Sequence, residues 1–245
     1  MLEIENLSKR YGETVALSGA TISFRPGTVH TILGENGSGK STLVKLLSGI
    51  VEPDAGEIRV DGRRFSGRRP SDFQAQGFAT VFQEVLIAPD RSVTDNILLG
   101  LDTPLRRSVP REKRRQAAAE ALAQFAVTEV PLDQPAGSLP LAAQQLIVLA
   151  RAIVRRPRIL ILDEVTAALD FADRESVFRL MRKRASEGAI LLFITHRMDE
   201  VMALSDRISI LRSGQVVKTE DKGMSSPQEL LRAMAPQTAA ELAHG

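Results

Sequence analysis

The clearest chemical signature in the sequence is the glycine-rich segment at residues 34–42, GENGSGKST. It fits the pattern G-x-x-x-x-G-K-[ST], in which glycines let backbone N–H groups wrap a phosphate chain and a lysine reaches the β- and γ-phosphates. A plain glycine-rich turn with a chance Lys-Ser pair is the alternative, and the apolar strand and amphipathic helix that flank the segment count against it. We therefore predict a phosphate-binding loop for a nucleoside triphosphate, with Ser41 on Mg²⁺ and nucleotide contacts from Gly34, Glu35, Asn36, Gly37, Ser38, Gly39, Lys40, Ser41 and Thr42.

Three further polar residues follow apolar runs of strand length. Residues 159–164 (ILILDE) end in Asp163, which we predict holds the metal through water, and Glu164, which we predict polarises the attacking water. The next such run, residues 189–195, is followed by His196, a predicted γ-phosphate contact. Acidic residues end many strands and a lone histidine is more often structural, but open parallel sheets bind ligands where these residues fall, at the carboxyl ends of strands.

The elements around the phosphate loop have regular patterns. A β-rich run at residues 28–33 leads into the loop, and its separation from Asp163 allows its strand and the strand that ends at Asp163 to be neighbours in one sheet. Lys40 is expected to face solvent when no ligand is bound. The helix after the loop is expected to end at Gly49, and its apolar face to carry Leu43, Leu46, Leu47 and Ile50.

The remaining elements indicate an α/β fold. The continuous apolar runs suit strands buried on both faces of a parallel sheet, whereas alternating segments near the N-terminus suit an antiparallel part. The predicted fold is a P-loop NTPase-type, mostly parallel sheet with an N-terminal antiparallel β part and a helical subdomain inserted at about residues 90–155. Other predicted elements are edge strands at 1–5 and 21–25, a hairpin at 207–219 across Ser213-Gly214, and a short helix in the tail.

Composition excludes several functional classes. The chain has 245 residues, a formal net charge of +2 and no cysteine. The absence of cysteine excludes disulfides, thiolate metal sites and cysteine nucleophiles. The small net charge gives the chain as a whole no strong attraction to nucleic acid. No apolar run reaches the roughly 20 residues of a membrane span, and the charged start is unlike a signal peptide. The expected location is the cytosol or the cytosolic face of a membrane.

Taken together, these motifs resemble the nucleotide-binding domain of ABC transporters, over residues 1 to about 222. The resemblance implies that ATP is the nucleotide, that Tyr11 stacks on adenine, and that Gln83 touches the metal and the attacking water near the permease contact. It also implies that Asp170 lies in the loop that crosses to a partner domain, and that His196 is the switch histidine. Segments such as SVTDNILLG and THRMDEVMALSDRI are most similar to the first half of sugar-importer ATPases, in which two such domains are often fused.

The resemblance also implies a role and partners. The chain would hydrolyse ATP to power import of a small solute, such as a sugar, through separate permease subunits at the cytoplasmic face of the cell membrane, as a peripheral subunit. It would pair with a second nucleotide-binding domain, as a homodimer or with a fused or separate domain, and work indirectly with a solute-binding protein. Nucleic acid is not an expected partner. Residues 223–245 are expected to be a tail or linker.

Two departures from the family pattern bear on activity. The signature LSGGQ is replaced by Leu139, Pro140, Leu141, Ala142 and Ala143, which lack the serine, both glycines and the glutamine. Pro140 removes a hydroxyl and an N–H but suits a first helical position, while Gln144 and Gln145 remain. Val165 replaces the usual proline after the catalytic glutamate. The chain is thus expected to hold a complete half-site for its own nucleotide and to offer its partner a degenerate one.

Three alternatives remain open on sequence grounds. A regulatory, weakly or non-hydrolytic subunit is favoured by the degenerate signature and opposed by Glu164 and His196. A soluble relative acting in DNA repair or on ribosomes lacks support, because the chain has no coiled coil, zinc cysteines or charged linker between two domains. The chain could also be a piece of a longer fused protein.

Overall fold

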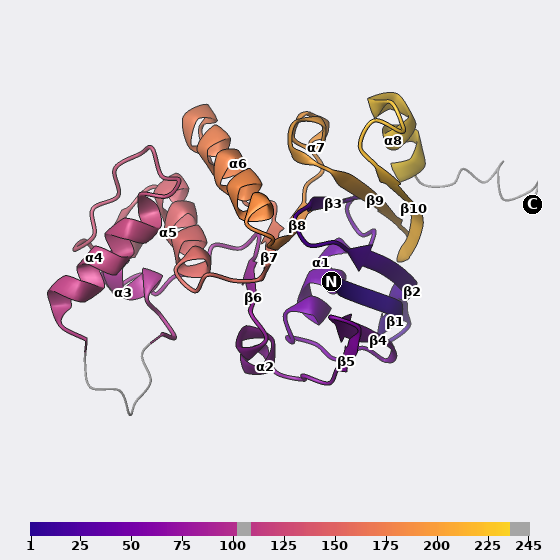
Figure 1. The fold of residues 1–245 in the computed structure, drawn as a ribbon, viewed down its shortest axis with the longest axis horizontal. Helices are drawn as coiled ribbons and strands as arrows, with labels where there is room; N and C mark the ends of the chain where they lie inside the picture. Colours follow the sequence, from indigo (N-terminus) through magenta and orange to yellow (C-terminus); the bar gives the residue numbers. More distant parts are fainter. Residues whose placement is uncertain (102–108, 236–245) are drawn as a thin grey trace, which may run out of the picture.

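The computed structural model describes residues 1–101 and 109–235, which form two sheets flanked by helices (Figure 1). One sheet is antiparallel, with strand order β2-β1-β4-β5. Its strands are β1 Leu2–Tyr11, β2 Thr14–Phe24, β4 Ala55–Val60 and β5 Arg63–Phe65. The strands predicted at 1–5 and 21–25 are the paired ends of a longer hairpin, in which Leu2 lies opposite Phe24. Only the second is an edge strand as predicted, because β1 lies between β2 and β4. Gly12, with φ 57°, closes its turn.

The second sheet has six strands in the order β10-β9-β3-β8-β7-β6. These strands are β3 Val29–Leu33, β6 Phe78–Val81, β7 Ile159–Asp163, β8 Ile190–Ile194, β9 Arg207–Arg212 and β10 Gln215–Asp221. All neighbours run parallel except β10, which forms the predicted hairpin with β9. The α/β prediction of a mostly parallel sheet with an antiparallel N-terminal part is confirmed.

The pairing of β3 with β7 that the sequence allows does not form. β8, not β7, lies beside β3, and β8 pairs with β7 on its other side. The helix α6 (Phe171–Ser186) provides the crossover from β7 to β8 and places β8 between the two strands. His196 therefore follows the middle strand of the three, rather than an outer one.

Both faces of the parallel strands are buried, which explains their continuous apolar runs. On β7, Leu160 and Leu162 pack with the helices α3 to α6. The alternate residues, Ile159 and Ile161, pack with the antiparallel sheet and α1 (Lys40–Leu47). The parallel sheet is thus a middle layer whose strand ends are fixed from both sides.

A helical region lies between β6 and β7 in the sequence and to one side of the sheets in space (Figure 1). Its helices are α3 Val93–Ile97, α4 Arg111–Leu122 and α5 Leu141–Ile153. The predicted boundary of about 90–155 is close to the outer ends of α3 and α5. Much of residues 123–140 is irregular apart from a short 3₁₀ turn at Ala136–Ser138, and residues 102–108 lie outside the described part.

Three short helices complete the fold. α2 (Pro70–Ala75) precedes β6, α7 (Met198–Leu204) follows β8, and α8 (Pro227–Met234) is the predicted tail helix. α8 packs on β9, where Leu230 and Met234 join a small core. The predicted polar end of the tail lies mainly in residues 236–245, outside the described range. None of the helices within residues 1–101 and 109–235 is long and apolar enough to cross a membrane.

The predicted face of α1 is partly wrong. The helix ends at Leu47, and Gly49 adopts φ 69°, a conformation that suits glycine and turns the chain away. Ile50 consequently leaves the helical face and is 50% exposed, whereas Leu43, Leu46 and Leu47 are buried as expected.

Candidate nucleotide-binding site

The predicted phosphate loop connects β3 to α1 and lies tightly against the rest of the molecule. A Cβ atom at Gly34 would collide with the carbonyl oxygen of Leu211. At Gly39, which has φ 107°, a Cβ atom would lie 2.5 Å from the carbonyl oxygen of Ala16. Real Cβ atoms do not come so close, so glycine is required at both positions for the loop to reach its place.

Lys40 lies beneath this loop. Its Nζ donates hydrogen bonds to the carbonyl oxygens of Gly34 (2.7 Å) and Glu35 (2.8 Å). Burial lowers the pKa of Lys40, although the nearby charges of Glu164 and Asp163 oppose the shift. The expectation that this side chain faces solvent is wrong, because only 7% of the residue is exposed. A buried ammonium needs acceptors, and the loop carbonyls provide two.

The loop also fits a phosphate group in its chemistry. The hydroxyl of Ser38 is buried and has no hydrogen-bond partner among the described residues. A buried donor without a partner is costly, and a phosphate oxygen would satisfy it. Glu35, Asn36 and Gly37 are exposed and form the outer part of the loop.

The residues available for Mg²⁺ are few. No group of three or more His, Cys, Asp or Glu residues in the described chain could hold a metal by itself. Ser41, at the start of α1, and Asp163, at the end of β7, offer one hydroxyl and one carboxylate. This set fits Mg²⁺, which uses one or two protein ligands together with substrate phosphates and water.

The carboxylates at the end of β7 have different surroundings. Burial, and then repulsion from Glu164, raises the pKa of Asp163 to about 6, while Lys40 acts in the opposite direction. Glu164 adopts φ 49°, a left-handed conformation that a non-glycine residue rarely takes. Its backbone N–H donates to the carbonyl oxygen of Ile194, 3.0 Å away on β8.

Glu164 and His196 form a direct contact at the strand ends. Oε1 of Glu164 lies 3.0 Å from Nδ1 of His196, whose ring is half exposed. The contact follows from the register in which Asp163 pairs with Ile194, since both side chains come just after this pair. Val165, which stands where the family has proline, is buried in the core on the helical side, so this departure leaves the contact in place.

Other predicted site residues lie apart from this contact. Gln83 is an exposed residue in the loop after the edge strand β6. Tyr11 ends β1, and 44% of the residue is exposed. Asp170 caps α6 by accepting a hydrogen bond from the N–H of Asp173. These three residues do not join the strand-end cluster, which consists of Glu164 and His196.

The degenerate signature forms the turn into α5. Pro140 is the residue before the helix rather than its first residue, and the helix forms as predicted. Leu141 is 58% exposed, whereas Ala143 is buried in the core. Nε2 of Gln144 donates to the carbonyl oxygen of Leu139, 2.7 Å away, which supports the turn in place of the missing polar residues.

Sequence reasoning missed one group next to the site. Glu200, on α7, accepts hydrogen bonds from the hydroxyls of Thr166 (2.8 Å) and Thr195 (2.6 Å). The only available signal is weak, because an acidic residue three positions into a helix is ordinarily explained as a capping residue.

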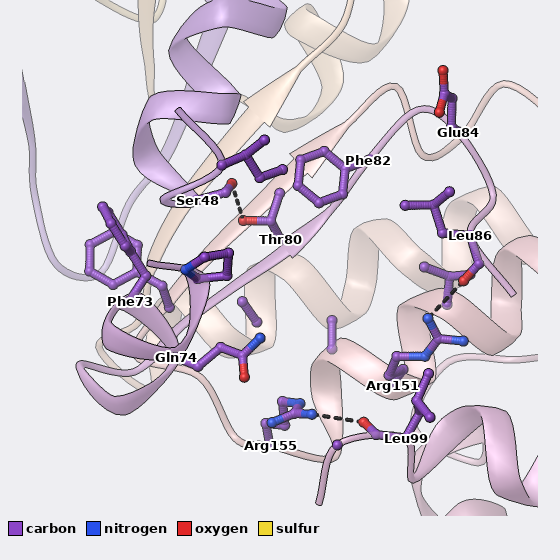
Figure 2. Close-up of a pocket in the computed structure, with 17 residues that line it drawn as sticks. Ser48, Phe73, Gln74, Thr80, Phe82, Glu84, Leu86, Leu99, Arg151 and Arg155 are labelled. Atoms are coloured by element: carbon purple, nitrogen blue, oxygen red, sulfur yellow. Dashed lines mark hydrogen bonds between the residues drawn. The ribbon is translucent and has the colours of Figure 1, made fainter. Parts of the chain in front are cut away.

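A groove separates the helical region from the sheets (Figure 2). Its volume is about 460 Å³, and its walls include Phe82 and Glu84, which flank Gln83. On the opposite wall, Arg151 donates to the carbonyl oxygen of Leu86 (2.7 Å) and Arg155 to that of Leu99 (2.8 Å). Most of the remaining lining is apolar, including Ile50, Phe73, Leu86 and Leu99.

Comparison with known proteins agrees with this geometry. The model of the ABC transporter family matches residues 17–167. A ribose import ATP-binding protein (RbsA 1) of Rhizobium johnstonii is 39% identical over 235 residues, which are 96% of this chain and 46% of that protein. A fructose import ATP-binding protein (FruK) of Bifidobacterium longum is 38% identical, over 93% of this chain and 44% of that protein. This chain thus spans about half the length of the curated relatives it matches.

A solved structure shows that the fold is also that of an ATP-binding cassette. A dimeric ATP-binding cassette in a post-hydrolysis state, bound to ADP and Pi, superposes with a TM-score of 0.81 at 27% identity. The match covers 90% of this chain and 98% of that chain.

Proposed function

Because this chain belongs to the ABC transporter family, we propose that it binds and hydrolyses ATP to power uptake of a small solute through a separate permease. The observation that carries the proposal is the 3.0 Å contact between Glu164 and His196, formed at the same sheet edge as the phosphate loop. A protein that only binds nucleotide has no need for a carboxylate and an imidazole held together beside the expected γ-phosphate.

The proposed chemistry is in-line attack of water on the γ-phosphate, with catalysis by positioning and charge stabilisation. Glu164 orients the water and accepts its proton, and His196 donates to a γ-phosphate oxygen. Lys40 exchanges its loop carbonyls for β- and γ-phosphate oxygens, and the Ser38 hydroxyl gains a partner. Mg²⁺ would be held by Ser41, Asp163 and Gln83, and it supplies neutralising charge for the phosphates. Tyr11 stacks on adenine.

The groove beside Gln83 is the proposed permease contact. Its apolar lining suits an apolar segment of another protein, and the carbonyl-bound Arg151 and Arg155 give one wall fixed shape. Gln83 lies between two groove residues, so a segment seated there would touch the loop that carries it. Such a contact would hold the chain at the cytoplasmic face of the membrane as a peripheral subunit.

The proposed solute is a sugar, and the proposed partner is a second nucleotide-binding domain. The two relatives named above are ribose and fructose import ATP-binding proteins, and each is about twice the length matched here. A second domain with an intact signature would supply the donors that Pro140 and Leu141 cannot. A solute-binding protein would act with the permease rather than with this chain, and no nucleic acid takes part.

The test is a steady-state ATPase assay of the chain alone, with its partner domain, and with the permease in vesicles. We expect turnover to rise when the partner is added and to respond to solute only when the permease is present. Tight ATP binding without hydrolysis in every assembly would instead support the alternative, a regulatory subunit that does not turn over ATP. The Glu164–His196 contact favours the hydrolytic reading.

A further inference from the structure

Glu200 is a charged side chain inside the protein, with only 1% of the residue exposed. Burying a carboxylate is costly unless it is hydrogen-bonded and paired. Its oxygens are bonded to the hydroxyls of Thr166 and Thr195, and Arg197 Nη1 lies 3.4 Å from Oε1. The fold therefore keeps this charge at a place where it binds two specific hydroxyl groups.

Helix capping does not account for this arrangement. Glu200 is the third residue of α7, the position from which a glutamate reaches back to the N–H of the residue before the helix. That N–H belongs to Arg197, and it donates instead to Oγ1 of Thr195, 3.1 Å away. Both Glu200 oxygens are directed to threonine hydroxyls, so the side chain joins separate segments rather than capping its own helix.

The two threonines belong to the turns that carry the strand-end cluster. Thr166 comes two residues after Glu164, and Thr195 comes directly before His196. One carboxylate thus bridges the turn after β7 and the turn after β8. Both threonines are buried, so water cannot take the place of Glu200 as the hydrogen-bond acceptor of either hydroxyl.

The turn after β7 needs such support. Glu164 has φ 49°, and a non-glycine residue persists there only where its surroundings determine the conformation. Its N–H is bonded to Ile194 on one side, and the buried Val165 and Thr166 follow on the other.

We propose that Glu200 is a positioning residue for ATP hydrolysis, which holds Glu164 and His196 in contact through Thr166 and Thr195. The inference deepens the proposed function and rests on it.

The first test measures the contact without any need for turnover. The sequence has three histidines, so the ring signals of His196 can be assigned by NMR from the spectrum of a His196→Asn variant. Glu164→Gln should shift these signals in the otherwise unchanged chain. In a Glu200→Gln background the shift should be largely lost, because the amide nitrogen that replaces one carboxylate oxygen cannot accept the hydrogen bond of the threonine hydroxyl that faces it.

Threonine variants keep the test valid if Glu200→Gln does not fold. Thr195→Val removes the hydroxyl at nearly constant volume and should also abolish the response of His196, whereas Thr195→Ser should retain it. The matched control is Thr94→Val, which removes another buried hydroxyl, bonded to the carbonyl oxygen of Leu132 at 3.1 Å in the helical region. This control should leave the response unchanged.

The second test measures kinetics. Glu200→Gln and Thr195→Val should lower kcat by about 10- to 100-fold, the usual scale for a small misplacement of reacting groups, with unchanged affinity for ATP. Thr195→Ser and Thr94→Val should keep kcat.

A His196 response that persists in Glu200→Gln and Thr195→Val, or that is absent from the parent chain, would overturn the proposal, as would an unchanged kcat in an active protein. Absence of hydrolysis by the parent chain in all assemblies would instead count against the proposed function, and the NMR response alone would then decide whether Glu200 positions the contact.

Discussion

The ammonium group of Lys40 lies 2.7 Å from the carbonyl oxygen of Gly34, so the phosphate loop is folded onto its own lysine. Both residues belong to the segment that is expected to bind the triphosphate. ATP therefore has to replace existing hydrogen bonds rather than attract a lysine that extends into solvent.

Lys40→Ala should lower ATP affinity by about 10- to 100-fold, because hydrogen bonds to charged groups contribute about 1.5–3 kcal/mol. The free energy of unfolding without nucleotide should change less, since the variant loses two hydrogen bonds but also removes a buried charge. Titration calorimetry and urea unfolding measure the two quantities. Lys45→Ala, an exposed lysine on the same helix, is the control. Unchanged ATP affinity in the Lys40 variant would refute the phosphate-loop assignment.

Glu164→Gln should leave ATP binding intact and reduce hydrolysis by about 100-fold or more, the scale expected for removal of a general base. The amide retains the size of the side chain but cannot accept a proton from water. Single-turnover hydrolysis of radiolabelled ATP measures the effect, with Glu187→Gln, a distant glutamate at the end of α6, as the control. If both variants hydrolyse ATP at the parent rate, another residue activates the water.

Repair of the signature turn should raise turnover by homodimers. A donor aimed at developing phosphate charge typically changes the rate by about 100- to 1,000-fold, and Pro140 and Leu141 supply none from their side chains. Full restoration of the LSGGQ signature would also replace Ala143 with glutamine, but Ala143 is only 6% exposed and a larger side chain there would overpack the core.

The variant to test is therefore Pro140→Ser with Leu141→Gly and Ala142→Gly. Its ATPase rate should exceed that of the parent chain at equal concentration and equal dimer fraction, while ATP affinity of the monomer stays the same. The control is the same repair combined with Glu164→Gln, which should remain slow. Fast turnover by the parent homodimer, with no gain on repair, would show that the turn works with proline and leucine in it.

Stability should decline at acidic pH because of His30. Burial, aided by Arg207 and Arg25, lowers the pKa of His30 from 6.5 to about 3, so the folded chain keeps the ring neutral. Below about pH 6.5 the unfolded chain takes up a proton that the folded chain refuses, and stability is lost as the pH falls through this window. At pH 5 the loss is about 2 kcal/mol.

His30→Phe tests this expectation, since the ring already packs against Phe24 at a centroid distance of 4.8 Å. Urea unfolding of both proteins at pH 7 and pH 5 should show a steeper loss for the parent chain by about 2 kcal/mol. Parallel losses in the two proteins would mean that His30 is protonated in the folded state or contributes nothing to the pH dependence.

Sequence patterns predicted the parts of the site that depend on local structure. A short motif predicted the phosphate loop between its strand and helix. Apolar runs of strand length predicted that Glu164 and His196 lie at strand ends. Strand order was harder, because a run such as β8 pairs equally well with either neighbour until the crossover helices are placed. The end of α1 near Gly49 was predicted, but Ile50 was wrongly placed on the helical face, because the chain turns at Gly49.

The burial of Lys40 and the long-range hydrogen bonds of Glu200 could not be predicted from the sequence. No local pattern shows that Lys40 is covered, because its cover consists of backbone carbonyls. Glu200 lies 34 residues from Thr166, and each of the two has an ordinary local explanation by itself. Only the fold, in which Glu200 on α7 accepts hydrogen bonds from residues that follow β7 and β8, brings them together.

The close contact between the phosphate loop and the β9–β10 turn has a consequence for biosynthesis. The carbonyl oxygen of Ser38 accepts a hydrogen bond from the N–H of Gly214, 2.9 Å away, and Gly34 lies against Leu211. The loop therefore leaves the ribosome long before the segment that supports it, and contacts of such large sequence separation form late. A nascent chain that stops short of the β9–β10 turn would therefore carry the complete motif without the contacts that hold the loop in place.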